Sequence, residues 1–153
     1  MVKKKFFAFV QARYDSMRMP GKVCKKLTSQ LSALEILLER LKKSKKIYEI
    51  IVLTSRNNNK EIIKIFKKSK IKFFIGSEKN VLDRYYKAAK KYKAKHILRI
   101  TADCPLTDIS IVNKVIDTYS KNNFDYVSNV NPPTFPDGLD IELFNFQSLQ
   151  SSW

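Results

Sequence analysis

The chain has 153 residues, of which 44% are hydrophobic, and this is enough for one domain with a buried core. No apolar run is long enough to cross a bilayer, and the short apolar run after the basic start predicts a strand instead of a signal peptide. Cys24 and Cys104 have the spacing of neither a metal site nor a disulfide framework, which favours a reducing cytoplasm. We therefore expect a cytoplasmic protein with no membrane partner.

The net charge of +16 is unevenly distributed. All 30 basic residues lie in residues 1–122, and residues 123–153 carry four acidic residues and no basic one. One interpretation is a nucleic-acid-binding surface, since clustered Lys and Arg provide phosphate affinity. The other is a solvated coat of lysines. We favour the coat, because the lysines are spread over several predicted helices and no aromatic-rich RNA-binding motif accompanies them.

In chain order, β-rich runs alternate with segments of helical periodicity. Strands are expected at residues 5–12, 47–55, 71–76, 94–102, 124–130 and 138–146, and helices at 32–44, 59–69, 80–92 and 108–122. Such alternation predicts an α/β fold in three layers, with a mostly parallel sheet and helices on both faces. Ligands of such sheets bind at the carboxyl ends of the strands, here just after residues 10, 54, 75 and 101.

The first of these strand ends carries the segment "QARYDSMRMPGK". Its side chains offer several hydrogen-bond donors and positive charges to an anion. These side chains are Gln11, Arg13, Ser16, Arg18 and Lys22. Pro20 and Gly21 allow a turn and a close approach of the backbone, but neither a Walker sequence nor Gly-x-Gly-x-x-Gly is present. The residues alone leave two interpretations open: a nucleoside triphosphate site, or a basic surface loop before a helix.

Acidic residues follow at two later places. Asp103 ends the fourth predicted strand and is either a Mg²⁺ ligand or a turn residue before Pro105. The other acidic residues lie in the lysine-free segment and either clamp sugar hydroxyl groups or shape turns of a β-ribbon. They are Asp137, Asp140 and Glu142. The single histidine, His96, lies in a strand and is assigned no role.

The segment "FVQARYDSMRMPGKV" resembles the N-terminal motif of the sugar cytidylyltransferases, above all the spore coat polysaccharide biosynthesis protein F group. This group is related to the acylneuraminate and 3-deoxy-manno-octulosonate cytidylyltransferases. The similarity continues, in the order of the family, through "GSEKNVLDRYYKAA", "RITADCPL", "DYVSN" and "FPDGLDIELF". It thus covers nearly the whole chain, and all three glycines lie inside these segments.

The resemblance implies a nucleotide-diphospho-sugar transferase (Rossmann-like) fold and the transfer of CMP from CTP to a sugar, such as an acid sugar, with Mg²⁺. It implies that the triphosphate is held by Arg13, Ser16, Arg18 and Lys22. Gln11 and Ala12 would shape the pocket for base and ribose, and Arg84 would lie near the nucleotide. The catalytic residues would be Arg18, Lys22 and Asp103, and Asp103 would bind the metal.

Two further expectations concern the acidic residues. The family places the stretch that corresponds to Asp137, Asp140 and Glu142 near the acceptor sugar. The alternative to a nucleotide-binding Arg84 is an Arg84 that forms a helix ion pair, and its neighbour Asp83 could also orient it.

The chain also departs from the family. It has no Gly in "CKKLTSQLSALEILLERL", where relatives have a glycine-containing turn, and it ends inside the start of a predicted helix. Relatives continue with further strands, dimer contacts and a second metal-binding aspartate. We therefore expect residues 1–153 to form a single nucleotidyltransferase domain that is truncated at its C-terminus. The alternatives are a nucleotide-binding fragment with little or no catalysis, and a basic nucleic-acid-binding module.

Overall fold

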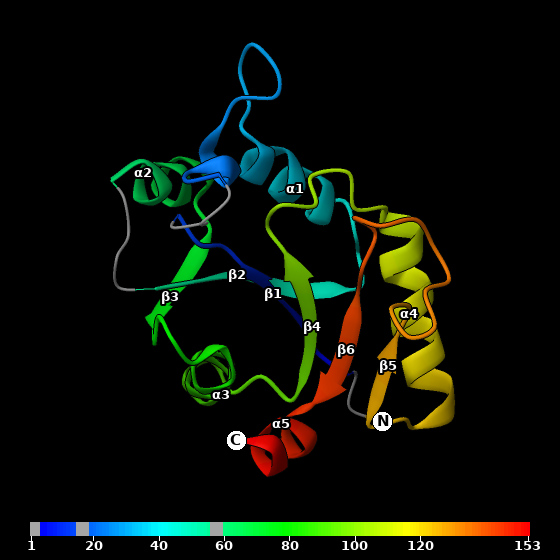
Figure 1. The fold of residues 1–153 in the computed structure, drawn as a ribbon. Coiled ribbons are helices and arrows are strands. Elements are labelled where there is room, and N and C mark those ends of the chain that lie inside the picture. Colours follow the sequence, from blue (N-terminus) through cyan, green and yellow to red (C-terminus); the bar gives the residue numbers. More distant parts are fainter. Residues whose placement is uncertain (1–3, 15–18, 56–59) are drawn as a thin grey trace.

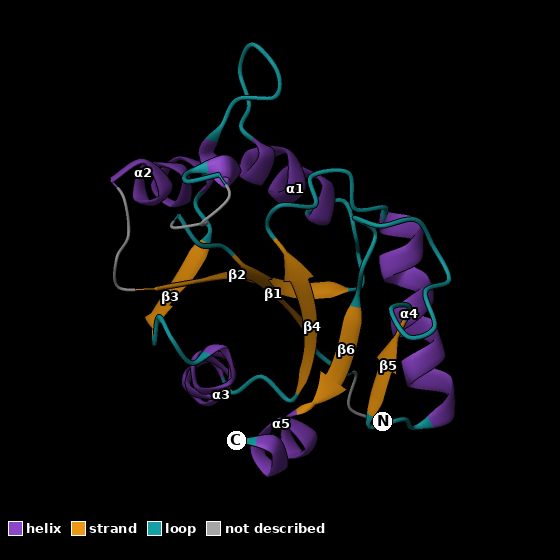
Figure 2. Ribbon diagram, in the orientation of Figure 1, coloured by secondary structure: helices purple, strands orange, loops and turns teal. Residues whose placement is uncertain are grey.

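The computed structural model describes residues 4–14, 19–55 and 60–153. In this part of the chain a sheet lies between two layers of helices (Figures 1 and 2). The strands are β1 (Phe6–Gln11), β2 (Ile47–Ser55), β3 (Lys72–Gly76), β4 (His96–Thr101), β5 (Tyr126–Ser128) and β6 (Glu142–Asn145). The helices are η1 (Lys22–Cys24, a 3-10 turn), α1 (Ala33–Leu41), α2 (Lys60–Ser69), α3 (Val81–Tyr92), α4 (Ile109–Asn122) and α5 (Phe146–Ser152). Every strand and helix expected from the sequence is present.

The six strands form one sheet in the order β3-β2-β1-β4-β6-β5. The pairs β1–β2, β1–β4 and β2–β3 are parallel, whereas β6 runs antiparallel to β4 and to β5. The predicted α/β fold with a mostly parallel sheet is therefore confirmed. From β1 the chain moves outward to β2 and β3 and then returns to place β4 on the other side of β1. This reversal is the topological switch point, where α/β sheets bind their ligands.

Strand β1 is buried on both faces, which explains its unbroken apolar sequence. Ala8 and Val10 face a core that contains α1, α2 and α4, with Leu34, Leu38, Phe66 and Val112 among its buried side chains. Phe7 and Phe9 face a second core, built with α3 and α5. Figure 1 shows the same division, with α1, α2 and α4 on one side of the sheet and α3 and α5 on the other. Among the described helices, none has the length and apolar character needed to cross a membrane.

Candidate active site

The carboxyl ends of β1 and β4 lie side by side at the switch point. Gln11 is aligned with Thr101 in the β1–β4 ladder, and the Ala102 amide donates a hydrogen bond of 3.0 Å to the Gln11 carbonyl. On the other side, the Ala12 amide donates to the Leu53 carbonyl at 2.9 Å. The basic turn after β1 and the turn that holds Asp103 therefore leave the sheet at adjacent points.

Gly21 closes the basic turn. Its φ angle of 70° lies in the left-handed region, which only glycine adopts without strain, and its amide donates a hydrogen bond of 2.7 Å to the Tyr14 carbonyl. A Cβ at this position would lie 3.0 Å from the Tyr14 ring. The glycine is thus required by the turn that brings Lys22 back to the end of the sheet. Ser16 and Arg18 belong to residues 15–18, which lie outside the described part of the chain.

Lys22 and Asp103 are in direct contact. The Lys22 ammonium group forms an ion pair with Oδ2 of Asp103, although 81 residues separate the two in the sequence. Partial burial acts to raise the pKa of Asp103, but the hydrogen bond and charge of Lys22 more than offset this, so its pKa lies below the ordinary value. Both side chains remain partly exposed, and the carboxylate is therefore charged and accessible at the edge of the sheet.

Arg84, in the first turn of α3, is fully buried. Its Nη1 donates a hydrogen bond of 2.7 Å to the Ser77 carbonyl, but Nε and Nη2 have no partner in the described structure. A Cβ on Gly76 would lie 2.8 Å from Cγ of Arg84, so the glycine makes room for this side chain. Asp83, the residue that could have oriented Arg84, instead pairs with Lys87 and accepts a hydrogen bond from the Trp153 indole.

The remaining nucleotide-binding candidates lie at the end of β1. Ala12 is fully buried, and Arg13 is exposed. Burial lowers the pKa of Arg84, and the positive charge of Arg13 lowers it further. The Gln11 side-chain oxygen is buried and has no hydrogen-bond partner in the described structure.

The acidic candidates of the lysine-free segment lie in different elements: Asp137 and Asp140 precede β6, whereas Glu142 lies in it. Asp137 accepts a hydrogen bond from the Gly138 amide. Burial raises the pKa of Cys104, which follows β4, and the charges of Asp103, Asp140 and Asp137 raise it further. Glu142 lies in β6, on the face of the sheet that α3 covers, and pairs with Arg99. The raised pKa of Cys104 also agrees with a thiol that has no nucleophilic role.

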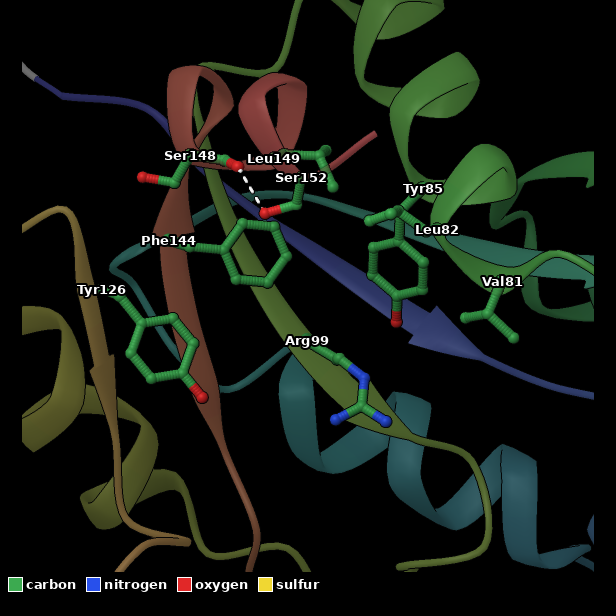
Figure 3. A pocket seen from close by; sticks show the side chains of 9 residues that line it. All are labelled: Val81, Leu82, Tyr85, Arg99, Tyr126, Phe144, Ser148, Leu149 and Ser152. Atoms are coloured by element: carbon green, nitrogen blue, oxygen red, sulfur yellow. Dashed lines mark hydrogen bonds between the residues drawn. The ribbon is translucent and has the colours of Figure 1, made fainter.

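Beside Glu142 lies a cavity of about 230 Å³ that the sequence did not predict (Figure 3). Its walls are largely apolar and come from α3, β6 and α5, with Tyr85, Phe144 and Leu149 among them. At one end the Arg99 guanidinium meets Glu142, whose other carboxylate oxygen accepts a hydrogen bond of 2.7 Å from the Tyr126 hydroxyl. Arg99 was not singled out from the sequence, although a charged residue within the apolar strand "HILRIT" is a signal that could have identified it.

A metal ion would have few protein ligands here. Within residues 4–14, 19–55 and 60–153, no group of three or more His, Cys, Asp and Glu side chains could hold an ion. The Asp103 carboxylate nevertheless fits a Mg²⁺ site that is completed by phosphate oxygens and water, since Mg²⁺ commonly uses only one or two carboxylates. The Lys22 ammonium group pairs with the same carboxylate, so Mg²⁺ would share Asp103 with Lys22 or displace it.

Comparison with known proteins identifies the family. Residues 7–152 match the sequence profile of the family described as "Cytidylyltransferase". The chain is 45% identical to "Uncharacterized protein MJ1063" of Methanocaldococcus jannaschii over 150 aligned residues. This alignment covers 97% of this chain and 60% of that protein. The chain is also 33% identical to "Spore coat polysaccharide biosynthesis protein SpsF" of Bacillus subtilis. That alignment covers 94% of this chain and 64% of the Bacillus protein.

A solved structure has the same fold. The cytidylyltransferase of Leptospira borgpetersenii superposes with a TM-score of 0.90 at 35% identity, over 97% of this chain and 63% of that protein. The chain thus spans less than two thirds of the length of these relatives. The family match extends over both strands that form the switch point and over all described site residues. The chain therefore belongs to the cytidylyltransferase family.

Proposed function

We propose that this protein transfers CMP from CTP to a hydroxyl group of a sugar and releases pyrophosphate, in the synthesis of a surface polysaccharide. The observation that carries the proposal is the contact between Lys22 and Asp103 at the adjacent ends of β1 and β4. It joins a cation suited to phosphate oxygens with a carboxylate suited to a metal ion. The spore coat relative supports the polysaccharide role, and an acid sugar is the acceptor to test first.

In the proposed reaction the sugar hydroxyl attacks the α-phosphorus of CTP, and pyrophosphate leaves in line. Arg13 and Lys22 bind phosphate oxygens, and Ser16 and Arg18, which lie between them in the sequence, contribute to the same binding. Positive charges aimed at the leaving pyrophosphate stabilise the negative charge that develops on it in the transition state. Arg84, at the start of α3, binds the nucleotide at the same end of the sheet.

Mg²⁺ would be held by Asp103 and would supply further charge neutralisation to the phosphates. The residues of this chain position the reactants, and no covalent intermediate with the protein is needed. In the proposed reaction Asp137 and Asp140, whose charges act on Cys104 beside Asp103, accept hydrogen bonds from the hydroxyl groups of the sugar. Since CTP is the donor, we place the reaction in the cytoplasm.

The experiment is a pyrophosphate-release assay with CTP, Mg²⁺ and a panel of sugars that includes acid sugars. Asp103→Asn and Lys22→Met should each lower the rate by about 100-fold or more, because each removes a charge that acts on the reacting phosphates. The matched controls are Asp117→Asn and Lys46→Met, which break a surface ion pair of similar exposure outside the site. These should keep the original rate.

Three other outcomes of these assays would each contradict a part of the proposed function. CTP binding without pyrophosphate release for any sugar would favour the catalytically inactive nucleotide-binding form. Salt-sensitive RNA binding without CTP binding would favour the nucleic-acid-binding module. Equal rate losses in the Asp103 and Asp117 variants would contradict the role of Asp103.

A further inference from the structure

The amino ends of the parallel strands form the edge of the sheet opposite the candidate active site. Strands β1, β2, β3 and β4 all begin at this edge, and the antiparallel β6 ends there. The Phe146 amide at the start of α5 donates a hydrogen bond of 2.9 Å to the Lys95 carbonyl, so α5 also lies at this edge (Figure 1). The two ends of the six-residue strand β1 are about 17 Å apart. A ligand at the amino edge would therefore not contact the residues of the candidate active site.

Three hollows lie along this edge and share walls. The largest has a volume of about 610 Å³ and lies at the starts of β1, β2, β3 and β4. It shares Tyr48 and Glu49 with a hollow of about 250 Å³, and Lys4 and Lys95 with one of about 340 Å³. We call the three together the amino-edge groove. It runs across β3, β2, β1, β4 and β6, which is a distance of about 19 Å at the usual spacing of neighbouring strands.

The walls of this groove carry an excess of positive charge. Its acidic residues are Glu49, which pairs with Lys72, and Asp125, which accepts a hydrogen bond of 2.6 Å from the Asn145 side chain. Six exposed lysines of the groove form no ion pair within residues 4–14, 19–55 and 60–153. They are Lys4, Lys5, Lys70, Lys91, Lys93 and Lys95. The groove is thus suited to a ligand that carries several negative charges.

These six lysines come from separate parts of the chain. They lie before β1, after α2, at the end of α3 and before β4. Their spread along the sequence favoured a solvated coat, but the parallel strands bring them to one edge. Burial lowers the pKa of His96 in this groove, and the charges of Lys4 and Lys95 lower it further. Since like charges at one edge repel one another, a bound anion would stabilise this arrangement.

Two of the lysines have a backbone conformation that is unfavourable for lysine. Lys70, directly after α2, has a φ angle of 52°, and Lys93, directly after α3, has a φ angle of 53°. Glycine and asparagine adopt this left-handed conformation at the ends of helices more readily. Both lysine side chains line the amino-edge groove. At these two positions the chain therefore has a positive charge in place of the residue types that the backbone favours.

Two exposed aromatic rings lie among the lysines. Tyr48 is 55% exposed and lines two of the hollows, and the Lys5 ammonium group lies 4.3 Å from the centre of its ring. Phe124 is 46% exposed and lines the third hollow. Aromatic rings beside cations bind single-stranded nucleic acids, because bases stack on the rings while the cations contact phosphates. An acidic polysaccharide has no bases to stack, and a flat lipid surface does not fill a groove.

We propose that the amino-edge groove binds single-stranded nucleic acid, with its lysines on the phosphates and with Tyr48 and Phe124 against the bases. The ligand must carry phosphates at regular intervals and expose its bases, as an unpaired strand does. This site is separate from the nucleotide site at the carboxyl ends of the strands and does not depend on the proposed function.

The test measures the binding of a fluorescent oligouridylate of about ten nucleotides by anisotropy, over a series of salt concentrations. Affinity should fall as salt rises, and saturating CTP should not displace the oligonucleotide. Lys70→Asn/Lys93→Asn removes two charges at positions where asparagine suits the backbone, so the melting temperature should stay the same or rise. Binding should weaken about fivefold or more. The slope of log affinity against log salt should become shallower by about 1.4, which is about 0.7 for each lost phosphate contact.

Lys64→Gln/Lys67→Gln is the matched control, because it removes the same charge from exposed positions of α2 outside the groove. It should keep the original affinity and slope. Tyr48→Leu should weaken oligonucleotide binding about fivefold or more and leave the binding of inorganic polyphosphate unchanged, since leucine offers no ring for stacking.

Several results would overturn the assignment. These are a folded original protein that does not bind the oligonucleotide, equal losses in the two lysine variants, and displacement of the oligonucleotide by CTP. Unchanged oligonucleotide binding by Tyr48→Leu would also overturn it. The same holds if inorganic polyphosphate of equal charge, an acidic polysaccharide or vesicles of anionic phospholipid bind as tightly as the oligonucleotide. None of these results bears on pyrophosphate release from CTP, so the proposed function is tested independently.

Discussion

At the scale of single residues, Arg84 is held in a position that folding alone does not favour. A buried guanidinium with two unpaired nitrogen atoms destabilises the folded state, because burial removes the water that would otherwise solvate the charge. Burial accordingly lowers its pKa, and the neighbouring charge of Arg13 adds to this effect. An incoming nucleotide would supply the missing acceptors, so the unfavourable burial of Arg84 is consistent with a binding role.

Replacing Arg84 should therefore separate stability from binding. We expect Arg84→Met to raise the free energy of unfolding by about 1 kcal/mol, since an apolar side chain of similar length needs no partners. The same variant should weaken CTP binding by about tenfold or more, since a hydrogen bond to a charged group is lost. Chemical denaturation and calorimetry measure the two effects.

Arg40 offers a matched control for this substitution. Its Nε donates a hydrogen bond of 2.8 Å to the Thr107 carbonyl, so Arg40→Met should lower the stability and leave CTP affinity unchanged. A clear loss of stability in Arg84→Met, as large as that in Arg40→Met, would show that Arg84 is a structural residue.

At the scale of elements, polar residues define where the helices begin. Ser32, Asn80, Asp108 and Asn145 each cap a helix by accepting a hydrogen bond from a backbone amide of the first turn. At α1 the cap is reciprocal, because the Glu35 carboxylate also accepts from the Ser32 amide at 2.9 Å. The start of the fourth long helix could be predicted from Asp108 and Ser110, since local sequence is sufficient for a cap.

The cap of α1 gives a prediction on pH. Burial acts to raise the pKa of Glu35, but hydrogen bonds from Lys68 and Ser32 lower it by more, so its native pKa lies below the ordinary value. A carboxylate with a lowered pKa contributes stability above its unfolded pKa and loses it as the pH falls through the native value. Glu35→Gln should therefore cost about 1 kcal/mol at pH 7, and this difference should shrink steadily below about pH 4.5.

Denaturant unfolding at a series of pH values would measure this difference. Glu39→Gln is the control, because its pair with Lys42 is exposed and should contribute less than about 0.5 kcal/mol at any pH. A Glu35→Gln difference that is the same at pH 3 and pH 7 would contradict the role assigned to the charge.

At the scale of the whole molecule, the sheet separates two hydrophobic cores that differ in how many candidate site residues they border. Among the described residues, the core under α1, α2 and α4 includes one nucleotide-binding candidate, Ala12, whereas the core under α3 borders Gln11, Arg84 and the cavity of Figure 3. Substitutions in the first core, other than at Ala12, should therefore change stability without changing the site.

Leu38 tests this division. It is fully buried in the first core, so Leu38→Ala should lower the free energy of unfolding by about 2–5 kcal/mol. The fraction of the protein that remains folded should bind CTP with the original affinity. Leu27, which is 57% exposed, is the control, and Leu27→Ala should change stability by no more than about 0.5 kcal/mol. A weaker CTP affinity in the folded Leu38→Ala protein would show that the two faces are coupled.

The order of strands and helices could be predicted from local pattern. Strand β1 is an unbroken apolar run, and apolar residues recur at helical spacing in α1, α2, α3 and α4. Both patterns show which side chains are buried, and both can be read from residues that are close together in the sequence. The cavity beside Arg99 could not be predicted, because its walls come from elements distant in the chain. The alternative that Asp83 orients Arg84 came from proximity in sequence, whereas in the structure the guanidinium donates to the Ser77 carbonyl.

The sequence by itself determined the α/β class, the position of the basic turn after the first strand and the acidic residue after the fourth. Each of these depends on periodicity and on residue type within a short window. Only the tertiary structure decided that Lys22 meets Asp103 and that Gln11 and Arg84 are left without partners. The physical reason is that strand order, and not spacing along the chain, decides which strand ends become neighbours and which buried polar atoms a ligand must satisfy.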